Sequence, residues 1–197
     1  MDKSRNMNRN LAYALSKLDE LGNRLEVTDK VKIEATRVYT SAVEHRVLNG
    51  RSIEVVIASS LYLGCRLAHA PFSVSEISNI CNVKDKNVVK GYKIIAKELH
   101  IKVPVINPKD YLERYSLLLE LPVEVTDKAE AIVLDAEEDG LIGGKSPTVV
   151  AGSSLYLAGL ICGEKRTQID ISTVAGVSDV AIRKCCKILR EGLDLDI

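Results

Sequence analysis

Tryptophan is absent from this 197-residue chain, and aromatic residues make up only 4% of it. The hydrophobic cores must therefore be built from Leu, Ile, Val and Ala. Long apolar runs are absent too, since no run reaches the ~18–20 residues that a membrane-spanning helix needs. The first residues are polar. Together these features predict a soluble intracellular protein.

Motifs for metal binding and catalysis are also missing. The five cysteines form no Cys-x-x-Cys pair and have no histidine at ligand spacing, so we expect reduced thiols and no zinc site. Cys185 and Cys186 are adjacent, and neighbours on a helix rarely form a disulfide. We therefore predict free thiols, one of them facing inward. His45, His69 and His100 are scattered along the sequence, and no grouping of Ser or Cys with His and a carboxylate suggests a catalytic site, which argues against an enzyme.

The net charge is zero overall but not within each half. Residues 1–104 hold 17 Lys and Arg against 11 Asp and Glu, a net charge of +6. Residues 105–197 hold 10 against 16, a net charge of −6. The halves are expected to face different partners, and the first half is better suited to an acidic surface.

A nine-residue apolar stretch occurs twice. Residues 55–63 return as residues 149–157, 94 positions later, with seven of nine residues identical. The offset holds without a gap from Gly50/Gly144 to Ile95/Leu189. This period exceeds the roughly 20–50 residues of solenoid repeats, so it indicates a duplicated domain. With a linker around Pro104, the predicted domains are residues 1–104 and 105–197.

The apolar periodicity predicts five helices in each half and no strand, hence an all-α fold. In the first half we expect helices over 10–21 (stopped by Gly22), from Thr28 or Asp29 to about Leu48, over the repeated stretch capped by Ser52, after Ser73, and over 85–99. In the second half we expect helices over 111–119, over 129–139, from Ser146 with Pro147 at the first position, and two more after residue 168. The 129–139 helix is expected to be one turn shorter than its counterpart, because Val-Thr-Asp-Lys at 125–128 repeats residues 27–30 at an offset of 98.

The segment 139–146 superficially suggests a nucleotide-binding loop. Its glycines have the wrong spacing, and no strand leads into it. Its counterpart in the first half, residues 49–52, matches no nucleotide motif. We interpret both segments as turns between helices that place Arg51 or Lys145 beside a helix N-terminus. Backbone amides there favour an anion, for which a DNA phosphate is a candidate.

Residues 169–189 have a helix-turn-helix pattern, with Ala-Gly-Val as the turn and a second helix begun at Ser178. The first turns of such a second helix enter the major groove of DNA. The residues exposed for that contact are Ser178, Val180, Ala181, Arg183, Lys184 and Lys187. Arginine can bond guanine, whereas valine senses shape or a thymine methyl group. Two packed core helices without any DNA contact would give the same pattern.

Several segments resemble those of one protein family and occur in the same order, and the resemblance covers nearly the whole chain. They are residues 9–16, 50–54, 60–66, 144–147 and 175–183. On these motifs the chain resembles the core of archaeal transcription factor B and of its eukaryotic relative, transcription factor IIB. The resemblance implies two tandem five-helix cyclin-like repeats, the second ending in the helix-turn-helix, that bind the TATA-binding protein on promoter DNA. It also implies that the last helix reads an element upstream of the TATA box.

The resemblance assigns individual residues as well. Val180 and Arg183 match the family's base-reading positions, and Lys86, Lys90 and Lys93 match positions that face the TATA-binding protein or adjacent phosphates. Family members recruit RNA polymerase through a zinc ribbon and reader segment that this chain does not include, so no cofactor is expected. The chain is then an excised core or a shortened paralogue. Its expected location is the archaeal cytoplasm, or the nucleus if it is eukaryotic.

The chain also departs from the family pattern. Asp85 stands where a basic residue is customary. The chain has Ala181, Cys185 and Cys186 where the family tends to have threonine, then polar or basic residues and an aromatic residue. The acidic second half would repel DNA away from the recognition helix. These departures keep an alternative open: a cyclin-like protein-interaction module or regulatory paralogue without sequence-specific DNA binding.

Overall fold

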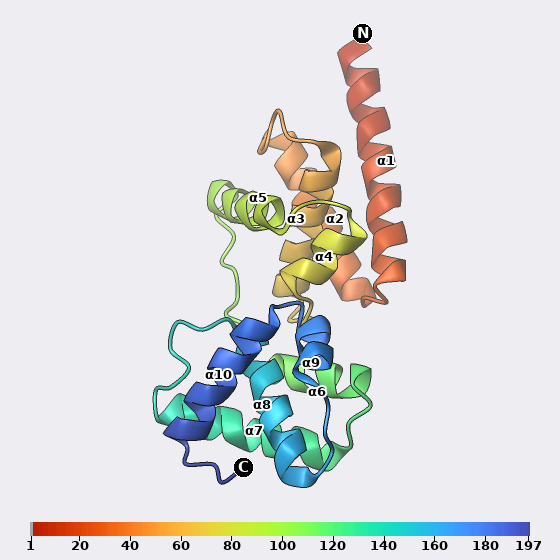
Figure 1. The fold of residues 1–197 in the computed structure, drawn as a ribbon. Coiled ribbons are helices and arrows are strands. Elements are labelled where there is room, and N and C mark those ends of the chain that lie inside the picture. Colours follow the sequence, from red (N-terminus) through yellow and green to blue (C-terminus); the bar gives the residue numbers. More distant parts are fainter. Residues whose placement is uncertain (1) are drawn as a thin grey trace. The chain divides into compact units, whose positions relative to one another are not determined.

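The computed structural model describes the backbone of residues 2–197 and the side chains of residues 10–197. Over this range the chain forms ten helices and no strand (Figure 1). Their bounds are α1 Asp2–Arg24, α2 Asp29–Glu44, α3 Ile53–Leu67, α4 Val74–Ile80, α5 Asp85–Glu98, α6 Lys109–Leu118, α7 Val123–Glu138, α8 Pro147–Cys162, α9 Gln168–Ala175 and α10 Asp179–Gly192. They divide into two compact units, the first ending at Val105 and the second comprising Ile106–Ile197. The predicted all-α fold with five helices per half is confirmed.

Helix α3 is the centre of the first unit. Every residue from Val55 to Cys65 is buried, and α3 contacts the other four helices of the unit. A helix apolar on all sides must be enclosed in this way. As predicted, Ser52 is the N-cap, and its side chain accepts a hydrogen bond from the Val55 amide at 3.4 Å.

Helix α8 is the centre of the second unit and contacts α6, α7, α9 and α10. Pro147 occupies its first turn and Ser146 its N-cap position, as predicted. The Ser146 hydroxyl bonds the Thr148 hydroxyl at 2.9 Å instead of capping an amide. Gly163 ends the helix in the left-handed conformation that glycine adopts without strain.

The duplication extends to the backbone. Helices α2, α3, α4 and α5 begin 94 residues before α7, α8, α9 and α10 respectively. Residues with positive φ after helix ends repeat at the same offset: Glu26/Glu120, Arg46/Gly140, Gly50/Gly144, His69/Gly163, Asn82/Gly176 and His100/Asp194. The two units are therefore the same five-helix design, with equivalent residues 94 positions apart.

Two predictions about the first unit were wrong. Helix α1 continues through Gly22 to Arg24. A Cβ on Gly22 would lie 3.1 Å from Cγ of Lys32 in α2, so the glycine leaves room for that side chain beside α1. Helix α2 ends at Glu44, about one turn before Leu48, and left-handed Arg46 follows it.

The second helix of the second unit was also predicted incorrectly. Helix α7 begins at Val123, so residues 125–128 lie inside it instead of preceding it. Helices α2 and α7 both contain 16 residues. The four-residue identity at an offset of 98 therefore does not mark equivalent positions.

Candidate nucleic-acid interface

Helices α9 and α10 form the predicted helix-turn-helix. Left-handed Gly176 makes the turn, and Ser178 caps α10 by accepting a hydrogen bond from the Ala181 amide at 3.2 Å. The inner side of α10 presents Ile182, Cys185, Cys186 and Leu189, all buried in the core that α8 also contributes to. This packing fixes which side of α10 faces outward.

The outer side of α10 carries most of the predicted DNA-contacting residues. Val180 is 48% exposed, and Arg183, Lys184 and Lys187 are exposed too. Ala181 is half-buried at the edge of this face, and the exposed Ser178 is engaged as the cap. An apolar group and three cations therefore share the first turns of one exposed helix, the geometry that a major groove can accept.

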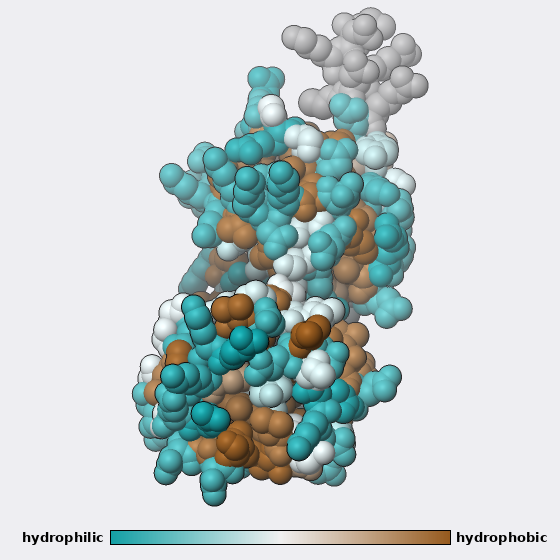
Figure 2. Space-filling model, viewed as in Figure 1, coloured by the Kyte–Doolittle hydropathy of each residue, from teal (hydrophilic) through white to brown (hydrophobic). Residues whose placement is uncertain are grey.

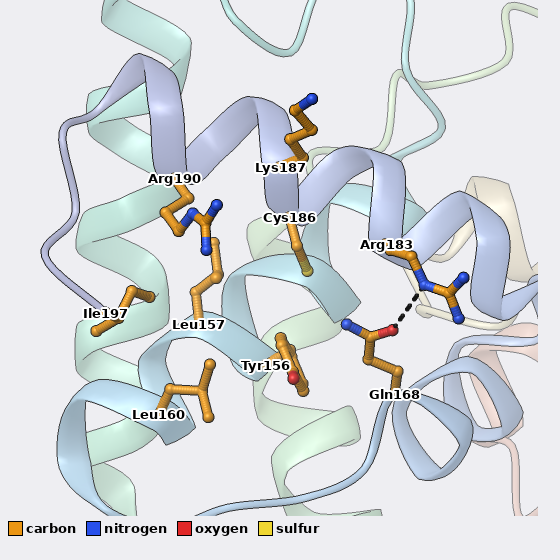
Figure 3. Close-up of a pocket in the computed structure, with 9 residues that line it drawn as sticks. All are labelled: Tyr156, Leu157, Leu160, Gln168, Arg183, Cys186, Lys187, Arg190 and Ile197. Carbon is orange, nitrogen blue, oxygen red and sulfur yellow. Dashed lines mark hydrogen bonds between the residues drawn. The ribbon is translucent and has the colours of Figure 1, made fainter.

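The Arg183 side chain has two partners that sequence reasoning missed. Its Nε donates to Oε1 of Gln168 in α9 at 3.4 Å (Figure 3), and its Nη2 donates to Oδ2 of Asp179 at 3.4 Å. The i, i+4 spacing of Asp179 and Arg183 could have been read from the sequence. The Gln168 contact could not, because it depends on how α9 packs beside α10.

Arg183 also borders a cleft of about 310 Å³ between α8, α9 and α10 (Figure 3). Cys186 lines this cleft, and the equivalent residue in the first unit is the larger Tyr92, whose ring packs against Tyr62 with centroids 4.9 Å apart. Burial raises the pKa of Cys186 to about 12 and raises the pKa of Cys185, so both thiols are neutral. Both face inward, which corrects the expectation that only one would.

The first unit contains the same motif in α4 and α5, with left-handed Asn82 in the turn. Lys86, Lys90, Lys93 and Lys97 are all exposed, and their spacing places them on one face of α5. We call this set the lysine stripe. Sequence reasoning missed Lys97, although it follows Lys93 by four residues. Among residues 10–197 no acidic side chain forms a salt bridge with any of the four lysines.

The two units differ in the chemistry of this outward face. At the offset of 94, the lysine stripe corresponds to Val180, Lys184, Lys187 and Glu191. Figure 2 shows hydrophilic side chains over α5, but hydrophilic and apolar side chains together over α9 and α10. A purely cationic face attracts phosphates or acidic residues, whereas an apolar group beside cations can discriminate between base edges.

The two basic loop residues precede the central helices, as predicted. Arg51 is exposed one position before the Ser52 cap of α3. Lys145 is half-buried before α8, and its Nζ donates to the Leu141 carbonyl at 2.6 Å. Lys145 therefore already uses one of its three donors within its own loop.

The described residues contain neither a cluster suited to a metal ion nor a membrane-spanning helix. No group of three or more His, Cys, Asp or Glu is placed to hold a metal ion. None of the described helices has the length and apolarity required to cross a bilayer.

A five-helix unit that occurs twice, with an exposed helix-turn-helix in each copy, defines a two-repeat, all-α protein. The family model "Transcription factor TFIIB repeat" matches residues 7–98 and again residues 101–192. The chain belongs to this family of transcription factors, which is not a family of enzymes.

Several curated archaeal proteins are similar to the chain. It is 41% identical over 189 residues to "Transcription initiation factor IIB" of Methanococcus maripaludis strain C7, covering 96% of this chain and 56% of that protein. The proteins of the same name from Methanocaldococcus jannaschii and Archaeoglobus fulgidus are also 41% identical over 96% of this chain, which covers 28% and 58% of their lengths. The chain thus spans about half the length, or less, of these relatives. A solved viral cyclin from herpesvirus saimiri is 12% identical, with a TM-score of 0.43, over 94% of this chain and 85% of that one.

Proposed function

We propose that the chain is the core of a transcription initiation factor that binds the complex of the TATA-binding protein with promoter DNA. The observation that carries the proposal is the contrast between α5 and α10, which are equivalent helices with different outward faces in a protein of the TFIIB family. The proposal assigns sequence-independent binding to a first domain, residues 1–104, and the reading of bases to a second domain, residues 105–197.

In this proposal α10 reads an element upstream of the TATA box. The major groove is about 12 Å wide and admits a helix. Arg183 would bond O6 and N7 of a guanine, and Val180 would contact a thymine methyl group. Lys184 and Lys187 would hold the flanking phosphates, with Ser178 and Ala181 at the helix start. Lys145, before α8, would lie against a phosphate.

The lysine stripe of α5 has the sequence-independent task. Its four ammonium groups would face phosphates beside the TATA box or an acidic surface of the TATA-binding protein, and Arg51 would add a further phosphate contact. Each phosphate that is neutralised releases counterions, so binding should weaken with salt. This division agrees with the net charge of +6 in residues 1–104. RNA polymerase is included as a third partner, which the family recruits through segments outside the core.

Electrophoretic mobility shifts on TATA promoter DNA, with the cognate TATA-binding protein and a series of salt concentrations, test the proposal. We expect a further shift on adding the chain, weaker at high salt, and dependent on the sequence upstream of the TATA box. A shift that ignores the upstream sequence would remove base reading by α10. No further shift at any salt concentration would favour a protein-interaction module instead.

A further inference from the structure

The two hydrogen bonds of Arg183 occupy one edge of its guanidinium group. Gln168 accepts the single N–H of Nε, and Asp179 accepts one of the two N–H groups of Nη2. Of the five arginine donors, three remain, and they include both on Nη1 and one on Nη2. A bidentate contact to guanine needs one donor from each of two nitrogens. The terminal edge formed by Nη1 and Nη2 therefore remains available.

We infer that Gln168 and Asp179 are positioning residues that hold Arg183 by its Nε/Nη2 edge and present its terminal edge to a guanine. This inference rests on the proposed function of α10. A long arginine side chain loses rotamer freedom when it binds. Restraining it beforehand lowers that cost and favours the base that matches the presented geometry.

The first unit shows that this arrangement is not a by-product of the fold. The equivalents of Gln168 and Arg183 there are Val74 and Val89, so neither partner exists. The equivalent acid, Asp85, instead accepts hydrogen bonds from Ser75 and Ser78 of α4.

In the second unit Asp179 does not accept such hydrogen bonds from the preceding helix. The residue equivalent to Ser75 is Ile169, which has no hydroxyl. Ser172, the equivalent of Ser78, donates to the Ile169 carbonyl at 2.9 Å, whereas Ser78 lies within hydrogen-bond distance of both the Ser75 carbonyl and Asp85. The carboxylate of Asp179 is left with Arg183. Gln168, an Asp179 carboxylate without serine partners, and Arg183 thus occur together only in the unit for which base reading is proposed.

The charge of Asp179 gives the inference a distinctive signature. A carboxylate in the first turn of a recognition helix repels the phosphates beside it, which weakens binding to every sequence. Asp179 should therefore lower general affinity while raising discrimination. A residue that only stabilised the fold would change general affinity and sequence discrimination in the same direction.

The experiment compares ternary complexes on two promoters that differ only by guanine or adenine at the upstream position where Arg183→Ala removes a preference. Asp179→Ala should reduce the guanine preference about two- to fivefold, as expected for an exposed ion pair, while affinity for the adenine promoter rises. Gln168→Met keeps the length of the side chain but not the acceptor, and should reduce the preference by a similar factor. Gln168→Glu restores an acceptor and should retain the preference.

Two controls separate positioning from other effects. Glu191→Ala removes an acid from the same helix that is paired with Lys187 at 3.8 Å, and should raise affinity for both promoters without changing the preference. Combined with Arg183→Ala, neither Asp179→Ala nor Gln168→Met should reduce the preference further, because coupled residues act through one interaction.

The outcomes distinguish the inference from the function on which it rests. If Arg183→Ala changes the preference at no upstream position, base reading by Arg183 fails and the positioning inference with it. If Arg183→Ala abolishes the preference but Asp179→Ala and Gln168→Met leave it intact, the proposed function stands and the positioning inference is overturned. Equal losses of affinity on the guanine and adenine promoters in Asp179→Ala and Gln168→Met would also overturn the positioning inference.

Discussion

Asp85 and Asp179 occupy equivalent positions 94 residues apart, yet their carboxylates bind different partners. Asp85 accepts a hydrogen bond from the Ser75 hydroxyl at 2.8 Å and a second from Ser78, which ties α5 to α4. Asp179 lies 3.4 Å from Nη2 of Arg183 on its own helix. The same acid at the start of the same helix therefore stabilises a helix junction in one unit and contacts an outward-facing side chain in the other.

This difference predicts unequal effects on stability. Asp85→Ala removes two hydrogen bonds to a charged acceptor and should lower the free energy of unfolding by about 1–3 kcal/mol. Asp179→Ala removes an exposed ion pair and should cost less than about 1 kcal/mol. Urea unfolding of the two variants measures both values. Equal losses of unfolding free energy would contradict the different roles assigned to Asp85 and Asp179.

Close packing between α2 and α3 gives a second prediction. A Cβ on Gly64 would lie 2.7 Å from the backbone nitrogen of Ala35, which cannot move without shifting α2. Gly64→Ala should therefore destabilise the chain by about 1–3 kcal/mol despite the better helix propensity of alanine. At Gly152 the nearest atoms are side-chain atoms of Ile171 and Ile182 at 3.1 Å, so Gly152→Ala should cost less. Thermal unfolding compares the two, and a larger loss at Gly152 would contradict the packing argument.

The buried thiols predict a loss of stability at alkaline pH. Burial raises the pKa of Cys186 from 9.0 to about 12. Between those values the unfolded chain releases the proton while the folded chain keeps it, so stability falls as the pH rises through this window. The free energy of unfolding should fall more from about pH 8 to about pH 10 for the chain than for Cys186→Ala, since the variant lacks this group. Equal declines would show that the Cys186 thiol does not contribute.

Equivalent positions in the two units allow a matched exchange of charge. Lys97 in α5 corresponds to Glu191 in α10. Lys97→Gln should weaken ternary complex formation and reduce the slope of log affinity against log salt by about one unit if Lys97 neutralises one phosphate. Glu191→Gln should strengthen binding to all sequences by removing repulsion. If Lys97→Gln leaves the slope unchanged, Lys97 does not contact a phosphate.

Local and repeated signals made much of the fold predictable from the sequence. The apolar stretches at 55–63 and 149–157 identified α3 and α8, and serine at 52, 73 and 178 marked helix starts because its side chain can accept from a free amide. The start of α7 was missed because a short sequence identity suggested the wrong alignment of the two halves. Gly22 was interpreted as a helix stop, but α1 continues through it to Arg24. The side chain that packs beside Gly22 is Lys32 of α2, and this contact between two helices is not visible in the local sequence.

The candidate site was predictable only in part. The exposed face of α10 followed from helical periodicity, and so did Lys86, Lys90 and Lys93 of α5. Gln168 was missed because its contact with Arg183 joins residues 15 positions apart through the packing of two helices. The cleft was missed because it depends on what surrounds Cys186 and not on a motif.

Paired measurements on Arg183→Ala and Lys90→Ala test the central claim most directly. For each variant, ternary complex affinity is measured on promoters with intact and substituted upstream elements across a salt series. The account predicts that Arg183→Ala loses roughly 1–3 kcal/mol of preference at one base pair with little change in the salt slope. Lys90→Ala should keep the preference and lose about one unit of slope. If the two variants lose preference and slope alike, the division of tasks between α10 and α5 is wrong.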